Sequence, residues 1–220
     1  HPEWRQLRFA VLVGLGAVHR AGLVHRDVKL DNLFVCDAEP GRGRALKLLD
    51  LGVAKLTDGA SPAPLAVPTA EGVSMGTPRF FSPEQATGAP LDARSDLYAV
   101  GLVLFALVTG RTPFEHLRSV DAVLRAHAHA APDPPSRHAR EPLPPGLEGA
   151  ILKALAKRPE DRFASAAAFA EELRRIAAAA PPERSLVRLF FAVLAASLVL
   201  SMAVTAVSLL WMAWASVTVS

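Results

Sequence analysis

The sequence predicts a mainly helical α+β domain followed by a single transmembrane helix. Two observations lead to this prediction. Up to about residue 180, stretches with apolar residues at helical spacing alternate with short apolar runs that are typical of strands. After Arg188 no charged residue appears, and Leu, Val, Ala and Phe dominate. The 220 residues leave room for one ordinary domain with an appendage.

The composition excludes some classes of function. The formal net charge is only +3, and the arginines are scattered among acidic residues, so we expect no nucleic-acid partner. The single cysteine, Cys36, rules out an intramolecular disulfide. His127 and His129 have no further ligands nearby, so we expect a solvated or partly packed face there rather than a metal site.

The first half of the chain predicts one helix and three short strands. Residues 3–21 carry Leu7, Val11, Leu15 and Val18 at the spacing of a half-buried helix. Gly22 ends this helix, and residues 23–24 form a short strand. Two further strands are expected at residues 33–36 and 45–49. Residues 57–74 lose all periodicity and are rich in Pro, Ala and Ser/Thr, so a mobile segment is expected there.

The second half predicts four helices. Residues 97–108 contain no charge, and we expect a buried central helix that is capped by Ser95 and ended by Gly110. This run is too short to span a bilayer comfortably. Amphipathic helices follow at residues 120–130, 147–157 and 164–179, and Pro181-Pro182 closes this part of the chain.

The last segment has the length and flanks of a membrane span. Residues 189–215 are 27 residues without a charge, whereas about 20 suffice to cross the hydrocarbon core. Basic residues precede the run and none follows it, which predicts that the N-terminal side lies in the cytosol. Trp211 and Trp214 lie near the far end, where an aromatic belt is expected. The alternative, a buried core helix, fits this length and flank less well.

One stretch carries the residues suited to catalysis, namely His25-Arg26-Asp27-Val28-Lys29-Leu30-Asp31-Asn32. It lies between predicted strands, and a further polar turn, Asp50-Leu51-Gly52, follows the next strand. Asp27, Asn32 and Asp50 are therefore expected on loops at strand ends. Such side chains suit the positioning of a hydroxyl nucleophile and the binding of magnesium beside a phosphate.

This arrangement resembles the eukaryotic-type serine/threonine protein kinases, in a bacterial-like form. Their catalytic loop has the pattern H-R-D-x-K-x-x-N and their metal-binding motif is D-F-G. Three more matches follow in order: Gly76 to Glu84 for the segment ending in A-P-E, Ser95 to Tyr98, and Arg158 to Phe163. The resemblance covers residues 1–180 and only the lower, C-terminal lobe. Leu30, Leu51 and Ser82 depart mildly from the pattern.

The resemblance implies roles for the residues of the site. Asp27 would be the catalytic base, and Lys29 would steady the transferred phosphoryl group of ATP. Asn32 and Asp50 would hold Mg²⁺. Thr77 would bridge Asp27 and Lys29, and Thr69 and Ser74 are candidate phosphorylation sites in the activation segment. Taken singly, each of these could be an ordinary loop residue.

Four further matched residues are expected to act structurally. Glu84 and Arg162 would form a buried ion pair that ties the activation segment to the lobe. Asp96 would hydrogen-bond the backbone of the catalytic loop. Arg26 would pair with a phosphate on the activation segment and order it.

The predicted organisation is a kinase-like lobe at residues 1–180, a juxtamembrane linker at 181–188 and a transmembrane helix at 189–215. The upper lobe, with its glycine-rich loop, is absent, and the first residue is histidine. We therefore expect a fragment that is inactive alone, from a signalling kinase anchored in the cell membrane by one span, with its lobe in the cytoplasm. Protein substrates are implied, and a dimer is possible. The alternative is a membrane-tethered pseudokinase or scaffold; a small-molecule phosphotransferase is less favoured.

Overall fold

The computed structural model describes residues 3–37, 44–48, 55–56 and 77–179, with side chains at 11–34, 48 and 78–179. The chain divides into two compact units, His1–Ala180 and Pro181–Ser220. The predicted linker and membrane span belong to the second unit and lie outside the described residues. Among the helices that are described, none has the length and apolar character needed to cross a membrane.

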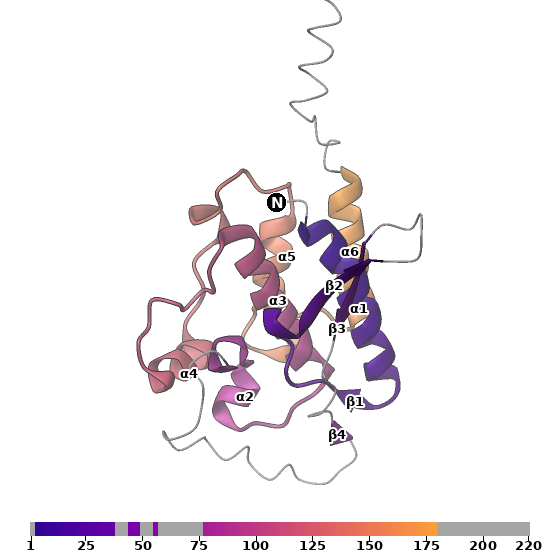
Figure 1. Cartoon of the computed structure of the whole chain (residues 1–220). Coiled ribbons are helices and arrows are strands. Elements are labelled where there is room, and N and C mark those ends of the chain that lie inside the picture. Colours follow the sequence, from indigo (N-terminus) through magenta and orange to yellow (C-terminus); the bar gives the residue numbers. More distant parts are fainter. Residues whose placement is uncertain (1–2, 38–43, 49–54, 57–76, 180–220) are drawn as a thin grey trace, which may run out of the picture. The chain divides into compact units, whose positions relative to one another are not determined.

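The described part is mainly helical with few strands, as predicted (Figure 1). The helices are α1 (Glu3–Arg20), α2 (Pro83–Thr87), α3 (Ala93–Thr109), α4 (Val120–His129), α5 (Leu147–Ala154) and α6 (Ala166–Ala179). Short 3₁₀ helices are η1 (Leu30–Asn32), η2 (Thr77–Phe80), η3 (Pro135–Arg137) and η4 (Pro159–Asp161). The strands are β1 (Leu23–Val24), β2 (Leu33–Asp37), β3 (Arg44–Leu48) and β4 (Lys55–Leu56).

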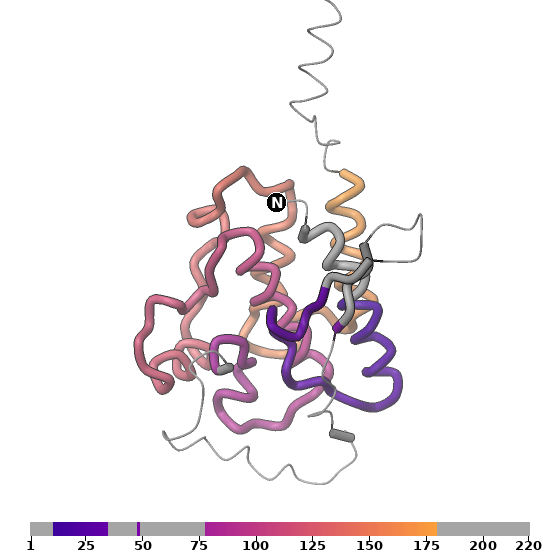
Figure 2. Tube along the Cα trace, in the orientation of Figure 1, coloured from indigo at the N-terminus to yellow at the C-terminus, as the bar shows by residue number. Residues whose placement is uncertain are grey.

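Helix α3 is the central element, and the prediction of a buried helix is confirmed. Its side chains are buried on all sides, and it runs through the middle of the first unit (Figure 2). The predicted cap is wrong, because the N-cap is Asp92, whose carboxylate accepts the backbone N–H of Arg94 at 2.7 Å. Ser95 lies inside the first turn, where tertiary contacts rather than solvent satisfy its hydroxyl. Gly110, at φ 79°, ends the helix as predicted.

The core packs around α3. Its large, fully buried side chains come from α1, α3, α5 and α6, and include Leu12, Leu15, Leu97, Tyr98, Leu102, Leu104, Phe105, Leu147, Ile151, Phe169 and Leu173. Helix α5 approaches α3 closely at Gly101, where an added Cβ would lie 2.9 Å from the Cβ of Ala154. The absence of a side chain at Gly101 therefore sets the distance between these two helices.

Two small antiparallel sheets lie on either side of residues 25–32, the segment predicted to carry the catalytic residues. Strands β2 and β3 form a hairpin in which Leu33 pairs with Leu48 and Asp37 with Arg44. Strand β4 returns to pair with β1, with Leu23 opposite Leu56 and Val24 opposite Lys55. Leu48 at the end of β3 and Lys55 at the start of β4 therefore lie beside β2 and β1, the two strands on either side of residues 25–32.

Candidate active site

The Asp27 loop, residues 25–32, runs from β1 to the end of η1. Val24 and His25 are fully buried, so the loop begins inside the core. Helix η1 starts after Lys29, whose carbonyl accepts the backbone N–H of Asn32 at 3.2 Å. This single turn brings Asn32 back toward Asp27, five residues earlier.

Three polar side chains of this loop meet at Asp27. The Lys29 ammonium donates to Oδ2 of Asp27 at 2.7 Å, and Nδ2 of Asn32 donates to the same oxygen at 2.9 Å. The same Nδ2 also donates to the backbone carbonyl of Asp27 at 2.8 Å. The side chains of Asp27 and Lys29 each remain 19% exposed. The loop thus presents a fixed carboxylate with a cation beside it, and both are within reach of solvent.

Arg26 has a strained backbone conformation, with φ 69°. A residue other than glycine adopts this left-handed region at a cost of about 1–3 kcal/mol, and only where its surroundings determine it. Here Oδ1 of Asp96 accepts the backbone N–H of Arg26 at 2.9 Å, and Oδ2 accepts that of His25 at 2.9 Å. His19 Nε2 lies 2.7 Å from Oδ2. The buried Asp96 of α3 therefore holds the backbone at the start of the Asp27 loop.

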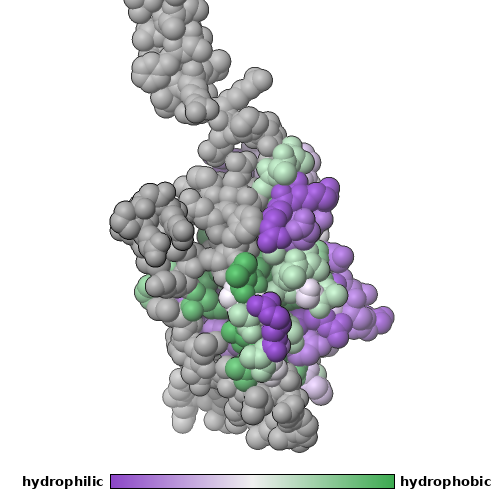
Figure 3. All heavy atoms as spheres, turned by 90° about the vertical axis from the view of Figure 1, so that its right-hand side faces the viewer, coloured by the Kyte–Doolittle hydropathy of each residue, from purple (hydrophilic) through white to green (hydrophobic). Residues whose placement is uncertain are grey.

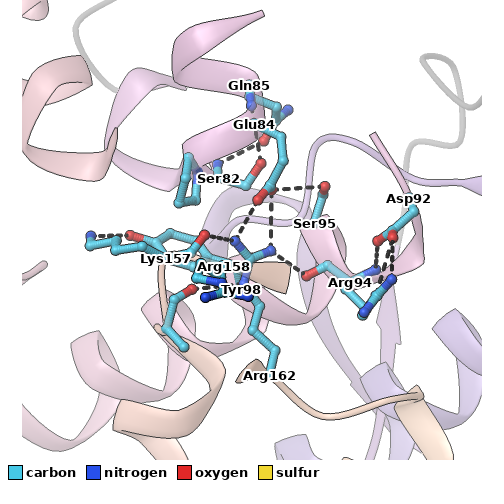
Figure 4. Close-up of polar contacts among 12 residues, drawn as sticks. Ser82, Glu84, Gln85, Asp92, Arg94, Ser95, Tyr98, Lys157, Arg158 and Arg162 are labelled. Carbon is cyan, nitrogen blue, oxygen red and sulfur yellow. Dashed lines mark hydrogen bonds and ion pairs between the residues drawn. The ribbon is translucent and has the colours of Figure 1, made fainter. Parts of the chain in front are cut away.

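A second polar cluster joins α2 to the loop before α6 (Figure 4). Arg162 reaches Glu84 with two hydrogen bonds, at 2.5 Å to Oε1 and 3.1 Å to Oε2. Ser95 Oγ donates to Oε2 of Glu84 at 3.0 Å. Arg162 also donates to three backbone carbonyls, those of Arg94, Ala156 and Lys157. Because its side chain is fully buried, these contacts compensate the loss of water around both charges.

The N-terminus of α2 carries a reciprocal cap that also contacts the Asp27 loop. Ser82 Oγ accepts the backbone N–H of Gln85 at 3.2 Å, and Oε1 of Gln85 accepts the N–H of Ser82 at 2.9 Å. Nε2 of Gln85 donates to the carbonyl of Arg26 at 2.8 Å. Gln85 was not among the predicted site residues, although the S-x-x-Q pattern is a known signal for such a capping box.

A third cluster corrects the prediction of a solvated or partly packed face for His127, which is fully buried, whereas His129 is exposed as predicted. Its Nδ1 lies 3.2 Å from the Tyr98 hydroxyl, and the ring of Phe114 meets it edge-on. The Lys157 ammonium donates to the Tyr98 hydroxyl at 3.2 Å and to the His127 carbonyl at 2.9 Å. The sequence pattern did not reveal this burial, because the rings that cover His127 come from other segments.

Burial sets the protonation states in this third cluster. Desolvation, assisted by the Lys157 charge, lowers the pKa of His127 to about 3. Desolvation, assisted by the Arg162 charge, lowers the pKa of Lys157 to about 8. Burial raises the pKa of the Tyr98 hydroxyl, which therefore stays protonated. His127 is thus neutral in the folded protein at ordinary pH.

Several predicted site residues lie outside the described part of the chain. These are Asp50, Thr69 and Ser74, so the pairing of Asn32 with Asp50 around a metal stays a prediction. Thr77 begins η2, but its side chain is outside the description, and its predicted bridge to Asp27 and Lys29 stays a prediction as well.

Apolar side chains lie exposed next to the polar loop. Leu30 is 37% exposed in η1 and Phe34 is 51% exposed in β2, on either side of Asn32. Val13 of α1 is a further exposed apolar residue, at 57%. On the side that carries α1 and α6, hydrophobic residues occupy the middle of the described surface and hydrophilic residues adjoin them (Figure 3). Leu30 and Phe34 thus place exposed apolar surface beside the Asp27 loop.

Comparison with known proteins gives consistent matches. A family model described as the protein kinase domain matches residues 2–173. Serine/threonine-protein kinase pkn3 of Myxococcus xanthus is 46% identical over 171 residues, which are 76% of this chain and 30% of the relative. Pkn1 of the same organism is 44% identical over 160 residues, 73% of this chain and 22% of the relative. PksC of Streptomyces coelicolor is 43% identical over 175 residues, 78% of this chain and 30% of the relative. The chain thus spans less than a third of the length of these relatives.

Proposed function

Because the chain belongs to the protein kinase family, we propose that it is the lower lobe of a serine/threonine protein kinase, which transfers the γ-phosphate of ATP to hydroxyl groups of protein substrates. The relatives that support this specificity are named serine/threonine kinases. Lys29, two residues after Asp27, supports the same specificity within the family.

The observation that carries the proposal is the meeting of Lys29 and Asn32 at one carboxylate oxygen of Asp27. Asp27 accepts a hydrogen bond from the substrate hydroxyl, orients it and takes its proton as transfer proceeds. Lys29, a compact positive charge, stabilises the negative charge on the transferred group. A scaffold that performs no chemistry has no need for this combination at a partly exposed position.

The residues present also suit the binding of a nucleotide with its metal. When bound, ATP and Mg²⁺ supply the phosphoryl group and neutralise part of its charge. The two hydrogen bonds of Asn32 use Nδ2, which fixes the plane of the amide and the direction of its oxygen. An amide oxygen fixed in this way is a hard ligand of the kind that Mg²⁺ prefers, and Asp50 would be the second.

The test uses the longest native polypeptide that contains this chain. Asp27→Asn should reduce phosphate transfer to a generic basic protein by about 10²–10⁴-fold, because an amide cannot accept the proton. The control is Asp31→Asn, which makes the same change at an exposed position of η1 and should keep near-normal rates. Phosphoamino-acid analysis should find phosphoserine or phosphothreonine. Equal phosphate transfer by the two variants would refute the role of Asp27 as catalytic base, whereas absence of transfer in the wild type would favour the pseudokinase or scaffold alternative.

We also propose that residues 189–215 anchor the lobe to the cell membrane, with the lobe in the cytoplasm. The support is the uncharged run of 27 residues, with Arg184 and Arg188 before it and no basic residue after it. A reporter that is active only outside the cytosol should be active when fused after Ser220. The same reporter should be silent when it is fused after Pro182 with the span deleted. Cytosolic location of both fusions would refute the anchor.

A further inference from the structure

Gln85 uses both ends of its side-chain amide, and the two ends contact different parts of the fold. Oε1 accepts the backbone N–H of Ser82 at 2.9 Å and so completes the cap of α2. Nε2 donates to the backbone carbonyl of Arg26 at 2.8 Å, across 59 positions of sequence. A cap requires only the oxygen. The contact made by the nitrogen therefore calls for a separate explanation.

The carbonyl that Gln85 contacts belongs to the strained residue of the Asp27 loop. Arg26, at φ 69°, has its N–H held by Asp96 and its carbonyl held by Gln85. The two contacts act on opposite sides of its Cα, so together they restrain both backbone dihedral angles of Arg26. A strained conformation persists only where its surroundings over-determine it in this way.

The same contact reaches Asp27 through the peptide bond. The carbonyl of Arg26 and the N–H of Asp27 share one planar group, which rotates as a unit. A hydrogen bond to that carbonyl therefore restrains the peptide plane that ends at the Cα of Asp27, from which the carboxylate side chain projects. Lys29 and Asn32 then fix the carboxylate from its other end.

The first turn of α2, which carries Gln85, is held by several buried hydrogen bonds. Glu84, the preceding residue, is tied to the buried Arg162 by two hydrogen bonds and to Ser95 by a third. The first turn of α2 therefore stands in a fixed position relative to α3 and to the loop before α6. Only a side chain with both a donor and an acceptor at its end can serve the cap and the carbonyl of Arg26 together.

We propose that Gln85 is a positioning residue for Asp27, through which the anchored end of the activation segment sets the geometry of the catalytic base. This inference rests on the proposed kinase function for its catalytic meaning, but its structural part can be tested without activity. Gln85 itself touches no reacting atom. Its role is to hold the Arg26–Asp27 peptide.

The structural test is hydrogen–deuterium exchange on the 220-residue chain. Gln85→Glu keeps an acceptor for the Ser82 N–H but loses the donor to Arg26. Amides of residues 24–30 should then exchange roughly three- to tenfold faster, as expected for the loss of one net hydrogen bond, while α2 stays protected. Ser82→Ala is the matched control, because it removes the hydroxyl from the other half of the cap and leaves the Arg26 contact. It should speed exchange in α2 and leave residues 24–30 unchanged.

Helix α3 is the internal reference for folding. Unchanged exchange of residues 24–30 in Gln85→Glu would overturn the proposal. Equal acceleration in Gln85→Glu and Ser82→Ala would also overturn it, because the effect would then be general loosening of α2. If Gln85→Glu accelerated amide exchange in α3 by the same factor as in residues 24–30, Gln85 would contribute to overall stability instead, and the proposal would fail as well.

A kinetic measurement then separates this proposal from the proposed function. In the longest native polypeptide that contains this chain, Gln85→Glu should lower kcat roughly three- to tenfold and leave the KM for ATP near its normal value. Loss of protection with no effect on kcat would refute the positioning role alone. Absence of phosphate transfer in the wild type would refute the kinase function and leave the exchange result intact.

Discussion

The carboxylate of Asp96 holds Arg26 in a left-handed backbone conformation, although the two residues lie 70 positions apart in the sequence. Asp96 is 1% exposed and belongs to the first turn of the central core helix. The backbone conformation of the Asp27 loop therefore depends on hydrogen bonds to a buried carboxylate of α3. The loop residues that would contact substrate do not determine that shape alone.

This relationship predicts that Asp96→Asn destabilises the fold. An amide offers one acceptor oxygen where two are used, so either the buried N–H of His25 or the partly buried N–H of Arg26 loses its partner. The expected loss is about 2–3 kcal/mol in the free energy of unfolding, measured by urea titration followed by circular dichroism. Asp92→Asn makes the same change four residues earlier, at the N-cap, where Asn and Asp serve equally well. A similar loss in both variants would contradict the assigned role.

The buried ion pair predicts a large difference between two neighbouring arginines. Arg162→Met leaves Glu84 as a buried charge without its partner and should cost about 3–5 kcal/mol of stability. Arg158→Met removes an ion pair with Glu160 from a side chain that is 71% exposed, and should leave stability nearly unchanged because solvent screens such a pair. Thermal or urea unfolding of the two variants side by side checks this. A small effect of Arg162→Met would mean that water reaches Glu84.

The buried His127 predicts a specific dependence of stability on pH. Its folded pKa is about 3, below the ordinary value of 6.5, so between these values the unfolded chain binds a proton that the folded chain does not. Stability should therefore fall as the pH falls from about 6.5 toward 3. The contribution approaches about 1.4 kcal/mol for each pH unit inside that window.

The measurement is the slope of unfolding free energy between pH 7 and pH 5. His127→Leu should reduce the slope by this contribution, whatever its effect on stability at pH 7. His129→Asn alters an exposed histidine of the same helix and should keep the wild-type slope. If His127→Leu kept the wild-type slope, His127 would already be protonated or solvated in the folded state.

The contact of α3 with α5 predicts opposite effects of one substitution at two glycines. At Gly101 the added Cβ would lie 2.9 Å from Ala154 and 3.1 Å from Leu155, so Gly101→Ala should cost about 1–3 kcal/mol. At Gly149 of α5 the added Cβ would have no atom within 4 Å other than its chain neighbours and the nearby backbone of its own helix. Gly149→Ala should therefore stabilise the protein by up to about 1 kcal/mol, through helix propensity alone. Melting temperatures that move in the same direction would contradict the close packing.

Much of the fold could be predicted from sequence because its elements carry strong local signals. The helices at residues 3–21, 120–130 and 164–179 appear within two residues of their predicted ends. The helix predicted at 147–157 ends three residues early, at Ala154. Helix α3 begins four residues before its apolar run, because the polar residues of its first turn are satisfied by partners from elsewhere in the chain.

The sequence by itself determined the central helix, the order of the motifs and the residue types at the Asp27 loop. These depend on periodicity and on chemistry within a few positions. The tertiary structure alone decided which distant groups meet: Asp96 with Arg26, Gln85 with the same residue, and His127 with Tyr98. A polar residue that is buried against a partner dozens of positions away looks, in sequence, the same as one that faces water. The packing of α2, α3 and α4 distinguishes the two cases. A buried polar group without a hydrogen-bond partner costs free energy, so burial favours the one arrangement in which these groups are paired.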